Sequence, residues 1–488
     1  MSQRAALFNL LLTVVLAAGL AGCATNPVTG GSDFVLMTEE QEIALGRQMH
    51  PRILQEMGVY DNAQLNAYVQ RVGEKLAANS HRPDLIYRFT VLDSQDVNAF
   101  ALPGGYIYIT RGLLAYLNSE AELAAVLGHE IGHVTARHTV RQQSTATATG
   151  LLGAILAGAS GVQGAGDLTN IAGTAIVRGY GREHELEADR LGAEYLARSG
   201  YDPQAMLQVI HVLKNQENFE IQRAKEEGRE PRIYHGLFST HPANDQRLQE
   251  VVGAASKLVV PGGGVINRAE FLTQLEGVTF GDSEREGIRR GNRFYHRDLD
   301  FALEFPRGWR IENFPDRLLA QSPEADGMMQ FSMRDLNKRM TPQVFMREQL
   351  KLTDLRNGEA IELDGMQGYT GIAEQKTSFG QLPVRYVVLY RGDKALIFAG
   401  LSKARGMPYK YDAQILQTAR SFHRLTDQER ALATAQRVHI IRAGRDTRFA
   451  TLARESAISD HPEAQLRLLN DYYPDGEPQP GESIKIVR

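Results

Sequence analysis

Two histidines and a glutamate stand in the pattern H-E-x-x-H, at His129, Glu130 and His133. Residues four apart lie on one face of a helix, with Cβ atoms about 5–6 Å apart, so both imidazoles can reach one metal ion. Glu130, next to the first histidine, would reach a water on that ion rather than the ion itself. The pattern therefore predicts a hydrolytic metal centre on a helix.

A second group of acidic residues follows later in the chain and contains Glu185 and Asp189. Four residues apart on a helix, they would supply one metal ligand and one carboxylate that hydrogen-bonds a ligand histidine, for which we favour His129. A solvated helix face is the ordinary explanation of such a charged run. Because H-E-x-x-H accompanies the run, the sequence favours a metal site over a solvated face.

The composition restricts what else the site could use. The 488 residues contain one cysteine, Cys23, which excludes a disulfide within the chain and any zinc or iron–sulfur cluster built on several thiolates. With 54 basic and 58 acidic residues the net charge is −4, so no basic excess points to a nucleic-acid partner. The length leaves room for about three domains.

The N-terminus predicts export. Residues 5–20 are mostly apolar and too few to span a bilayer, so residues 1–22 are expected to be a secretory signal peptide. The segment ends in Leu-Ala-Gly-Cys, which resembles the lipobox of bacterial lipoproteins. That resemblance implies cleavage before Cys23, lipidation of Cys23, and a lipidated tether over residues 23–37. Ala24 in place of aspartate favours the outer membrane. An uncleaved anchor with an unused thiol is the alternative.

The site needs particular elements around it. Helical periodicity runs over residues 39–77, and strands are expected at residues 87–92 and 106–110. Ser119 and Glu122 form a capping-box pattern, which predicts the start of the helix that carries H-E-x-x-H. We expect this helix to run past Arg137.

The second acidic group should also lie on a helix, from residue 182 to the Ser-Gly pair at residues 199–200. A further helix is expected after the Asp-Pro pair at residues 202–203. Between the two metal-binding segments, residues 151–179 are rich in glycine and alanine. They are expected to form either a flexible cover over a cleft or a helical hairpin in the core.

The motifs together resemble a known family. The segments that carry the resemblance are residues 98–100 (N-A-F), 103–105 (P-G-G), 129–138 (H-E-I-G-H-V-T-A-R-H) and 185–189 (E-L-E-A-D). They are similar to the zinc metallopeptidases that include HtpX, BepA and the CAAX prenyl endopeptidases, over roughly residues 38–252. The resemblance implies a gluzincin site with one Zn²⁺, held by His129, His133 and Glu185, with Glu130 as catalytic base and Asp189 in support.

The expected reaction follows from this ligand set. Three protein ligands leave zinc a fourth position for water, whose pKa the ion lowers towards about 7. Glu130 would take a proton from the attacking water and return it to the leaving amine. The strand at residues 106–110 is expected to pair with an extended substrate by β-addition.

Two nearby histidines are expected to stay off the metal. In a continuous helix His138 would lie on the opposite side from His129 and could not reach the same ion. The metzincin pattern would place a third histidine at residue 139, which is Thr139. His184 precedes Glu185 but faces elsewhere on its helix, which indicates a structural role.

His241 has two possible roles. The segment S-T-H-P at residues 239–242, followed by Arg247, resembles a loop in the periplasmic branch of the family. There the matching histidine can occupy the fourth zinc position and hold the enzyme latent, and Arg247 would be an active-site contact. An ordinary polar loop is the alternative.

The C-terminal half carries weaker resemblances. Residues 305–309, 363–366 and 421–422 resemble PsbP-like modules, which implies binding or docking rather than catalysis. Residues 440–444 and 480–487 resemble a peptidoglycan-binding LysM module, but an extra arginine, Arg445, interrupts the pattern. Glycan binding and a purely structural cap are both open.

We therefore expect an α+β protein whose mainly helical gluzincin domain has a small sheet beside the active-site helix. The expected parts are a signal peptide (1–22), a tether (23–37), the metallopeptidase domain (38–260), a linker (261–268), an α/β module (269–428) and a LysM-like βααβ module (429–488).

The expected function is that of a zinc endopeptidase on the periplasmic face of the outer membrane. The resemblance implies unfolded or misassembled envelope proteins as its substrates. A chaperone or assembly factor with a latent zinc site is the main alternative, and a peptidoglycan-directed zinc hydrolase is another.

Overall fold

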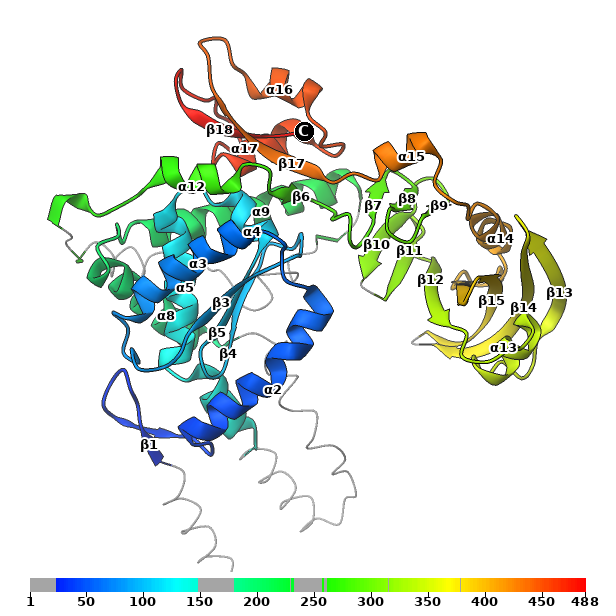
Figure 1. Ribbon diagram of the computed structural model, residues 1–488, viewed down its shortest axis with the longest axis horizontal. Coiled ribbons are helices and arrows are strands. Elements are labelled where there is room, and N and C mark those ends of the chain that lie inside the picture. The colour runs from blue at the N-terminus through cyan, green and yellow to red at the C-terminus, as the bar shows by residue number, and fades with distance from the viewer. Residues whose placement is uncertain are drawn as a thin grey trace, which may run out of the picture. The chain divides into compact units, whose positions relative to one another are not determined.

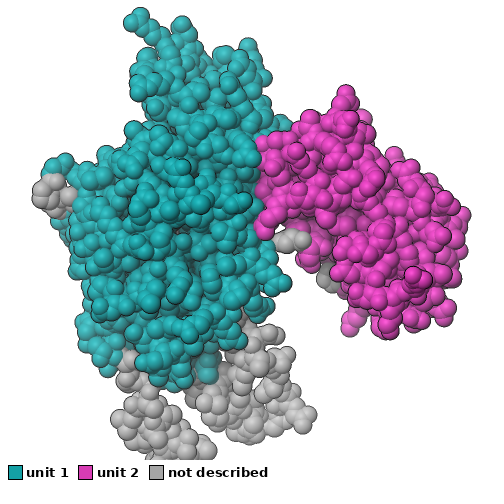
Figure 2. Space-filling view, viewed as in Figure 1, with its two compact units in different colours: residues 1–280, 436–488 teal, residues 281–435 magenta. Residues whose placement is uncertain are grey.

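The computed structural model describes residues 23–147, 180–228, 230–231, 257–258, 261–314, 316–377 and 379–488. The chain divides into two compact units, unit 1 (Met1–Phe280 with Gln436–Arg488) and unit 2 (Gly281–Ala435), which Figures 1 and 2 show. Three predicted features lie outside the described residues: the signal peptide, the stretch at residues 151–179, and the loop with His241 and Arg247.

A three-stranded sheet forms the frame of unit 1. Its order is β3 (Arg88–Leu92), β5 (Tyr106–Thr110) and β4 (Ala99–Leu102), with β3 parallel and β4 antiparallel to β5. Because β5 pairs on both sides, the prediction that residues 106–110 add a substrate strand is wrong. Within the described part of the chain, the outer side of β4 pairs with no further strand.

The two faces of this sheet are covered by different helices (Figure 1). Side chains alternate along β5, so Tyr106 and Tyr108 point to one face while Ile107 and Ile109 point to the other. The tyrosines pack with apolar residues of α2 (Glu39–Met57). The isoleucines belong to the main core, which also contains the buried residues of α3 (Ala63–Ala77).

The helical periodicity over residues 39–77 is divided between two helices. Gly58, at φ 69°, ends α2, and its N–H donates to the Leu54 carbonyl. Asn62 then caps α3 by accepting from the Leu65 N–H. The periodicity alone did not show this break, because the apolar positions of the two helices follow each other with similar spacing.

The predicted metal-binding segments lie on α5 (Glu120–Thr135) and α8 (Arg182–Arg198), and α9 (Ala205–Glu226) follows. Every residue of α5 is buried. Ser119 caps α5 as predicted, but the Glu122 carboxylate accepts from the Asn118 N–H and the Ser119 hydroxyl instead of closing a capping box.

The prediction that this helix runs past Arg137 is wrong. α5 ends at Thr135, and Arg137 adopts a left-handed conformation with φ 54°. Residues 138–147 are helical again. Arg137 is held in this turn by hydrogen bonds from its side chain to Glu42 and to the Met37 carbonyl, both far away in the sequence.

The C-terminal block belongs to unit 1 and has the predicted order of strand, helix, helix and strand. Its elements are β17 (Gln436–Arg442), α16 (Phe449–Glu455), α17 (Pro462–Leu469) and β18 (Ser483–Val487). β17 pairs with β18 and with β6 (Thr279–Phe280), where Gln436 lies opposite Phe280. Unit 2 is therefore inserted between two paired strands of unit 1.

This arrangement differs from the expected series of modules. The expected linker at residues 261–268 lies within unit 1, and α12 (Arg268–Leu275) follows it there. The expected module boundaries near residues 269 and 429 fall instead after Phe280 and before Gln436. The cause is the pairing of β6 with β17, which joins distant parts of the chain.

Unit 2 is built mainly from antiparallel strands. Its larger sheet has seven strands: β10 (Arg310–Phe314), β11 (Arg317–Gln321), β12 (Gly327–Asp335), β16 (Lys394–Ser402), β15 (Gly380–Arg391), β14 (Met366–Thr377) and β13 (Arg356–Leu363). A second sheet contains β7 (Ile288–Arg290), β8 (Arg293–His296) and β9 (Phe301–Glu304).

The helices of unit 2 are α13 (Pro342–Glu348), α14 (Asp412–Arg420) and α15 (Asp427–Leu432). The predicted mixture of helices and strands is confirmed, but all strand pairs between the named strands of this unit are antiparallel. Its main core is rich in aromatic residues and includes Trp309 and Tyr411, whose rings meet at right angles 5.0 Å apart.

The described chain begins with a short hairpin of β1 (Cys23–Thr25) and β2 (Ser32–Phe34), within the region expected to be a tether. Asn26 stabilises its turn by accepting from the N–H groups of Val28 and Thr29. None of the helices in the described ranges is both long and apolar enough to cross a bilayer.

Candidate metal centre

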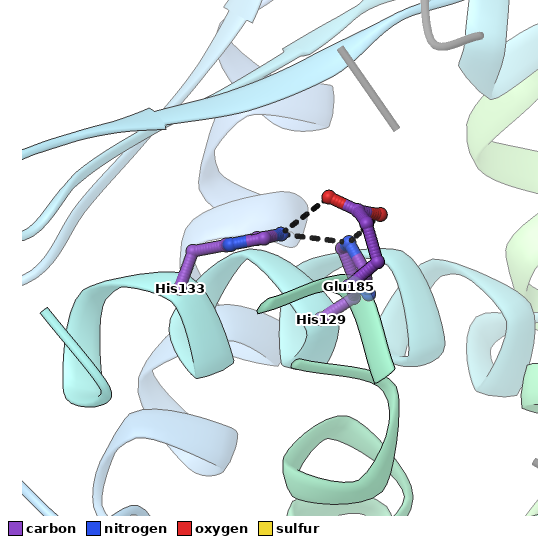
Figure 3. A group of neighbouring side chains, drawn as sticks. All are labelled: His129, His133 and Glu185. Atoms are coloured by element: carbon purple, nitrogen blue, oxygen red, sulfur yellow. Dashed lines mark hydrogen bonds and ion pairs between the residues drawn. The ribbon is translucent and has the colours of Figure 1, made fainter. Parts of the chain in front are cut away.

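The structure brings His129, His133 and Glu185 together, as Figure 3 shows. The Nε2 atoms of the two histidines are 3.0 Å apart. The Glu185 carboxylate lies 3.6 Å from His129 Nε2 and 3.5 Å from His133 Nε2 through its two oxygens. All three side chains are buried, so water does not screen the attraction of their lone pairs for a cation.

Small residues let α5 and α8 approach closely enough to form this cluster. A Cβ added at Gly132, inside the H-E-x-x-H motif, would lie 2.9 Å from the Ala188 carbonyl oxygen. A Cβ added at Gly192 would lie 3.0 Å from the His129 backbone nitrogen. Both helices therefore need glycine at their crossing, and this contact carries Glu185 to the two histidines.

The hydrogen bond that the sequence predicts between Asp189 and His129 is present. His129 Nδ1 lies 2.8 Å from Asp189 Oδ1, and Asp189 is fully buried. A buried carboxylate at this position favours a proton on Nδ1, which leaves the Nε2 lone pair directed at the cluster.

His133 is supported in a different way, by His138. Their Nδ1 atoms are 2.8 Å apart, and His138 Nε2 lies 3.0 Å from Glu187 Oε2. His138 does not belong to the three-residue cluster, as predicted, but the predicted reason is wrong because the helix does not continue to it.

Burial and hydrogen bonding set the charges of this network. The hydrogen bond from His138 is the main cause that lowers the pKa of Glu187 to about 2. Burial lowers the pKa of His138, and it lowers the pKa of His184, whose ring stacks on His138 at 4.3 Å, to about 4. His184 is thus a packing partner of this network, in agreement with its predicted structural role.

The three donors fit a zinc ion. Donor atoms about 2.0–2.2 Å from one tetrahedral ion lie roughly 3.3–3.5 Å from one another. The observed separations of 3.0, 3.5 and 3.6 Å are close to that range. Two imidazoles and one carboxylate are also the ligand set of zinc hydrolases, which keep one coordination position open.

Glu130, the predicted base, follows His129 on α5 and is fully buried, with an exposed fraction of 0%. A small cleft next to the cluster is lined by Ala101, Leu102 and Pro103, at the end of β4, and by His133 and Tyr180.

Sequence reasoning missed Tyr180. Its ring stacks on His133 with centroids 4.0 Å apart, and its hydroxyl lies 2.7 Å from the Thr139 hydroxyl. Burial raises the pKa of Tyr180, which keeps the phenol protonated. A single tyrosine before α8 has no pattern in the sequence that would have pointed to this contact.

A buried ionic cluster at the end of α5 was also missed. Glu42 accepts hydrogen bonds from Arg82 at 2.9 Å and from Arg137 at 2.8 Å. Arg82 also donates to the Val134 carbonyl at 3.0 Å, in the last turn of α5. The three residues come from separate segments, so no local spacing predicts that they meet.

Three other predicted residues cannot be placed at the site. His241 and Arg247 lie outside the described residues, so their proposed switch and contact roles stay predictions. Cys23 is the first residue of β1, and its lipidation also stays a prediction.

Comparison with known proteins adds independent information. Residues 63–255 match the family described as Peptidase family M48. The chain is 33% identical over 276 residues to the Beta-barrel assembly-enhancing protease of Yersinia pestis, covering 52% of this chain and 53% of that protein. It is 36% identical over 138 residues to the Mitochondrial metalloendopeptidase OMA1 of Arabidopsis thaliana, covering 28% of each.

The chain spans about half the length of the bacterial relatives that it matches. Among solved structures, cyanobacterial PsbP from Synechocystis aligns with 28% of this chain and 95% of its own, at 18% identity and a TM-score of 0.23. A likeness at this TM-score does not establish a shared fold, so the PsbP-like resemblance stays a prediction. The LysM-like resemblance also stays a prediction.

The M48 match includes all three residues of the cluster and the buried Glu130 between its histidines. Relatives of this region carry the names protease and metalloendopeptidase. The match over residues 63–255 and the names of these relatives support a metalloprotease.

Proposed function

We propose that the protein is a zinc-dependent endopeptidase of the bacterial envelope that cleaves unfolded or misassembled envelope proteins. One observation carries the proposal: His129, His133 and Glu185 direct three donor atoms at one point, and the buried Glu130 lies on the same helix. This is the arrangement that metal-assisted peptide hydrolysis requires.

Each residue has a definite task in this reaction. His129, His133 and Glu185 hold the metal, and Asp189 fixes the tautomer of His129. Zinc bound there would polarise the peptide carbonyl and lower the pKa of water. Glu130 accepts a proton from the attacking water and later delivers it to the leaving amine nitrogen.

The substrate binds as an extended strand along β4. The outer side of β4 is free of other strands in the described part of the chain, and its end lines the cleft beside His133. Backbone hydrogen bonds to β4 would hold many sequences with little selection among side chains. Such tolerance suits a protease whose substrates are unfolded chains.

The proposed location is the periplasmic face of the outer membrane, with a lipid on Cys23. The lipobox-like segment before Cys23 supports this location, and so does the name of the bacterial relatives, which refers to β-barrel assembly. We propose peptidoglycan as a further partner, bound by the terminal βααβ block.

The test is the substitution Glu130→Gln in the zinc-loaded protein. We expect cleavage of a reduced, carboxymethylated protein to fall by between about 100-fold and 10,000-fold, because the base is lost while the metal ligands stay. Zinc content should be unchanged. Glu183→Gln, which alters an exposed glutamate on α8, is the matched control and should cleave like the wild type. Full cleavage by Glu130→Gln would refute the mechanism.

A second candidate function is assembly of outer-membrane proteins, with a zinc site that is latent at rest. The phrase assembly-enhancing in the name of the relatives favours it. We propose that His241 holds the latent state. If so, His241→Ala should raise proteolysis well above wild type. If both proteins lack protease activity but bind unfolded outer-membrane proteins, the assembly function alone is supported.

A further inference from the structure

The two ligand histidines are arranged alike but supported differently. Both turn Nε2 towards Glu185, and both turn Nδ1 away from it. The Nδ1 of His129 meets a carboxylate, Asp189, while the Nδ1 of His133 meets another imidazole, that of His138. His138 has an exposed fraction of 0%, so water does not compete for this contact.

The partners of His138 decide which nitrogen carries each proton. Its Nε2 lies 3.0 Å from a carboxylate oxygen of Glu187, which can only accept. A neutral His138 that donates from Nε2 has its lone pair on Nδ1. His133 must then donate from Nδ1, and its own lone pair is left on Nε2, the atom that faces His129 and Glu185.

Two further contacts hold His138 in this orientation. Arg141 donates to the same Glu187 oxygen at 3.0 Å, which fixes the carboxylate. The His184 ring stacks on the His138 imidazole, with ring centroids 4.3 Å apart and an angle of 19° between the rings. A rotation of His138 would break the hydrogen bond and the stacking together.

The left-handed turn at Arg137 makes this contact possible. A continuous helix would place residue 138 at about 140° from residue 133 around the axis, too far for a ring contact. Because α5 ends at Thr135 and Arg137 has φ 54°, the chain folds back and brings His138 beside His133. The turn at Arg137 therefore positions His138 for both its contact with His133 and its hydrogen bond with Glu187.

We propose that His138 is a positioning residue that fixes His133 as a zinc ligand, the role that Asp189 has for His129. The inference rests on the proposed zinc site and goes beyond it, because His138 itself touches neither the metal nor the substrate. Outer hydrogen-bond partners of this kind typically change metal affinity by about 10- to 100-fold when they are removed.

The experiment measures zinc affinity of the full chain by competition with a chelator. His138→Leu fills similar volume but cannot accept a hydrogen bond, and we expect it to weaken zinc binding by about 10- to 100-fold. His138→Asn places an amide oxygen near the position of Nδ1, so it should recover most of the affinity. A role in packing alone would not distinguish an acceptor in this way.

Two more variants keep the test clear. Glu183→Gln changes an exposed side chain on the same helix as Glu187 and should leave zinc affinity within about threefold of wild type. Glu187→Ala removes the acceptor for His138 Nε2 at a partly exposed position, and should weaken zinc binding less than His138→Leu. This variant serves if His138→Leu does not fold.

Three results would overturn the proposal: wild-type zinc affinity in a folded His138→Leu protein, equal losses in His138→Leu and His138→Asn, or no effect of Glu187→Ala. Zinc affinity is measured without substrate. An inactive protein that shows the expected order of affinities would therefore refute the proposed peptidase function and support the role of His138.

Discussion

The two units differ sharply in the side chains that they bury. Among the described residues of unit 2, Arg385 is the one acidic, basic or histidine side chain that is buried. Unit 1 buries many: Glu42, Arg82, Asp93, Arg111, Glu120, Glu122, His129, Glu130, His133, Arg137, His138, Glu185, Asp189 and Lys485. Burying such groups costs free energy unless each is paired. The stability of unit 1 therefore depends on the pairing of these side chains.

Burial of charge alone does not mark the site. At the N-terminal end of α5, Glu120 accepts hydrogen bonds from the hydroxyl of Tyr201 at 2.8 Å and from the amide of Asn267 at 3.0 Å. Those groups satisfy each other and hold elements together. Near the other end of the same helix, the metal-binding nitrogen atoms of His129 and His133 converge with the Glu185 carboxylate on one point instead. Convergence of lone pairs separates the metal centre from the structural charges.

The largest expected effect on stability comes from Lys485, which is fully buried on β18. Its Nζ donates to the carbonyls of Ala115 and Leu117, both at 2.7 Å. Lys485→Met should lower the free energy of unfolding of unit 1 by about 3 kcal/mol, because these buried acceptors lose their donor. Urea unfolding followed by the helical circular dichroism signal measures this loss.

The single tryptophan gives the control for that experiment. Trp309 lies in the core of unit 2, so its fluorescence follows the unfolding of unit 2. Its transition should not move in Lys485→Met. Lys214→Met, at an exposed position on α9, should change neither transition by more than about 0.5 kcal/mol. A loss below about 1 kcal/mol in Lys485→Met would show that this buried charge is not structural.

The one buried charge of unit 2 should matter less. Arg385 on β15 makes two hydrogen bonds to Asp412 on α14, at 2.6 and 2.9 Å, and Asp412 is partly exposed. Arg385→Met should therefore destabilise unit 2 by about 2 kcal/mol, since water can replace part of what Asp412 loses. The Trp309 fluorescence transition measures it, and zinc affinity should stay unchanged.

The control for Arg385 is Arg356→Met, which removes an exposed partner of Glu374 in the same sheet and should have almost no effect. Equal shifts from the two substitutions would mean that burial does not set the contribution of Arg385. The contrast between the units would then rest on unit 1 alone.

The sequence predicted the metal-binding elements better than their surroundings. The spacing of His129 and His133, with Ser119 as cap, depends on local helix geometry, which can be read from a sequence. Glu185 lies on a second helix and was expected from its acidic run and from the family resemblance. The end of α5 could not be predicted, because Arg137 is not a residue type that favours a left-handed turn. Its conformation depends on Glu42 and Met37, which are distant in sequence.

The predicted domain boundaries differ from the structure for the same physical reason, because they depend on contacts between residues that are distant in the sequence. β6 has two residues and no alternating pattern, yet it pairs with β17, which follows unit 2 in the sequence. Sequence patterns therefore placed a linker at residues 261–268 and a separate module at residues 429–488. Long-range strand pairing places the insertion points at Phe280 and Gln436.

A smaller effect concerns pH. His296 packs near the rings of Phe294 and Phe301, and burial lowers its pKa below the ordinary value. The folded state therefore binds a proton less readily than the unfolded state. The contribution of His296 is full above the unfolded pKa of about 6.5 and is lost as the pH falls towards the folded pKa.

We thus expect the urea midpoint of the Trp309 transition to fall between pH 7.5 and pH 5.5 more in the wild type than in His296→Asn. Subtracting the two profiles removes the contributions of other titrating groups. Parallel profiles would show that His296 titrates alike in both states and that its partial burial does not make unit 2 sensitive to pH.

The smallest expected effect on the metal centre comes from the largest change, the excision of unit 2. Gln436 and Phe280 are direct partners in an antiparallel pair, so a two-residue Asn-Gly turn can join them in place of residues 281–435. All three zinc donors and their hydrogen-bond partners lie in unit 1. The excised protein should bind zinc within about threefold of the full chain, since no group that positions a ligand is removed.

Loss of tryptophan fluorescence would verify the excision. A tenfold weaker zinc affinity would instead mean that unit 2, despite its nearly uncharged interior, supports the polar interior of unit 1.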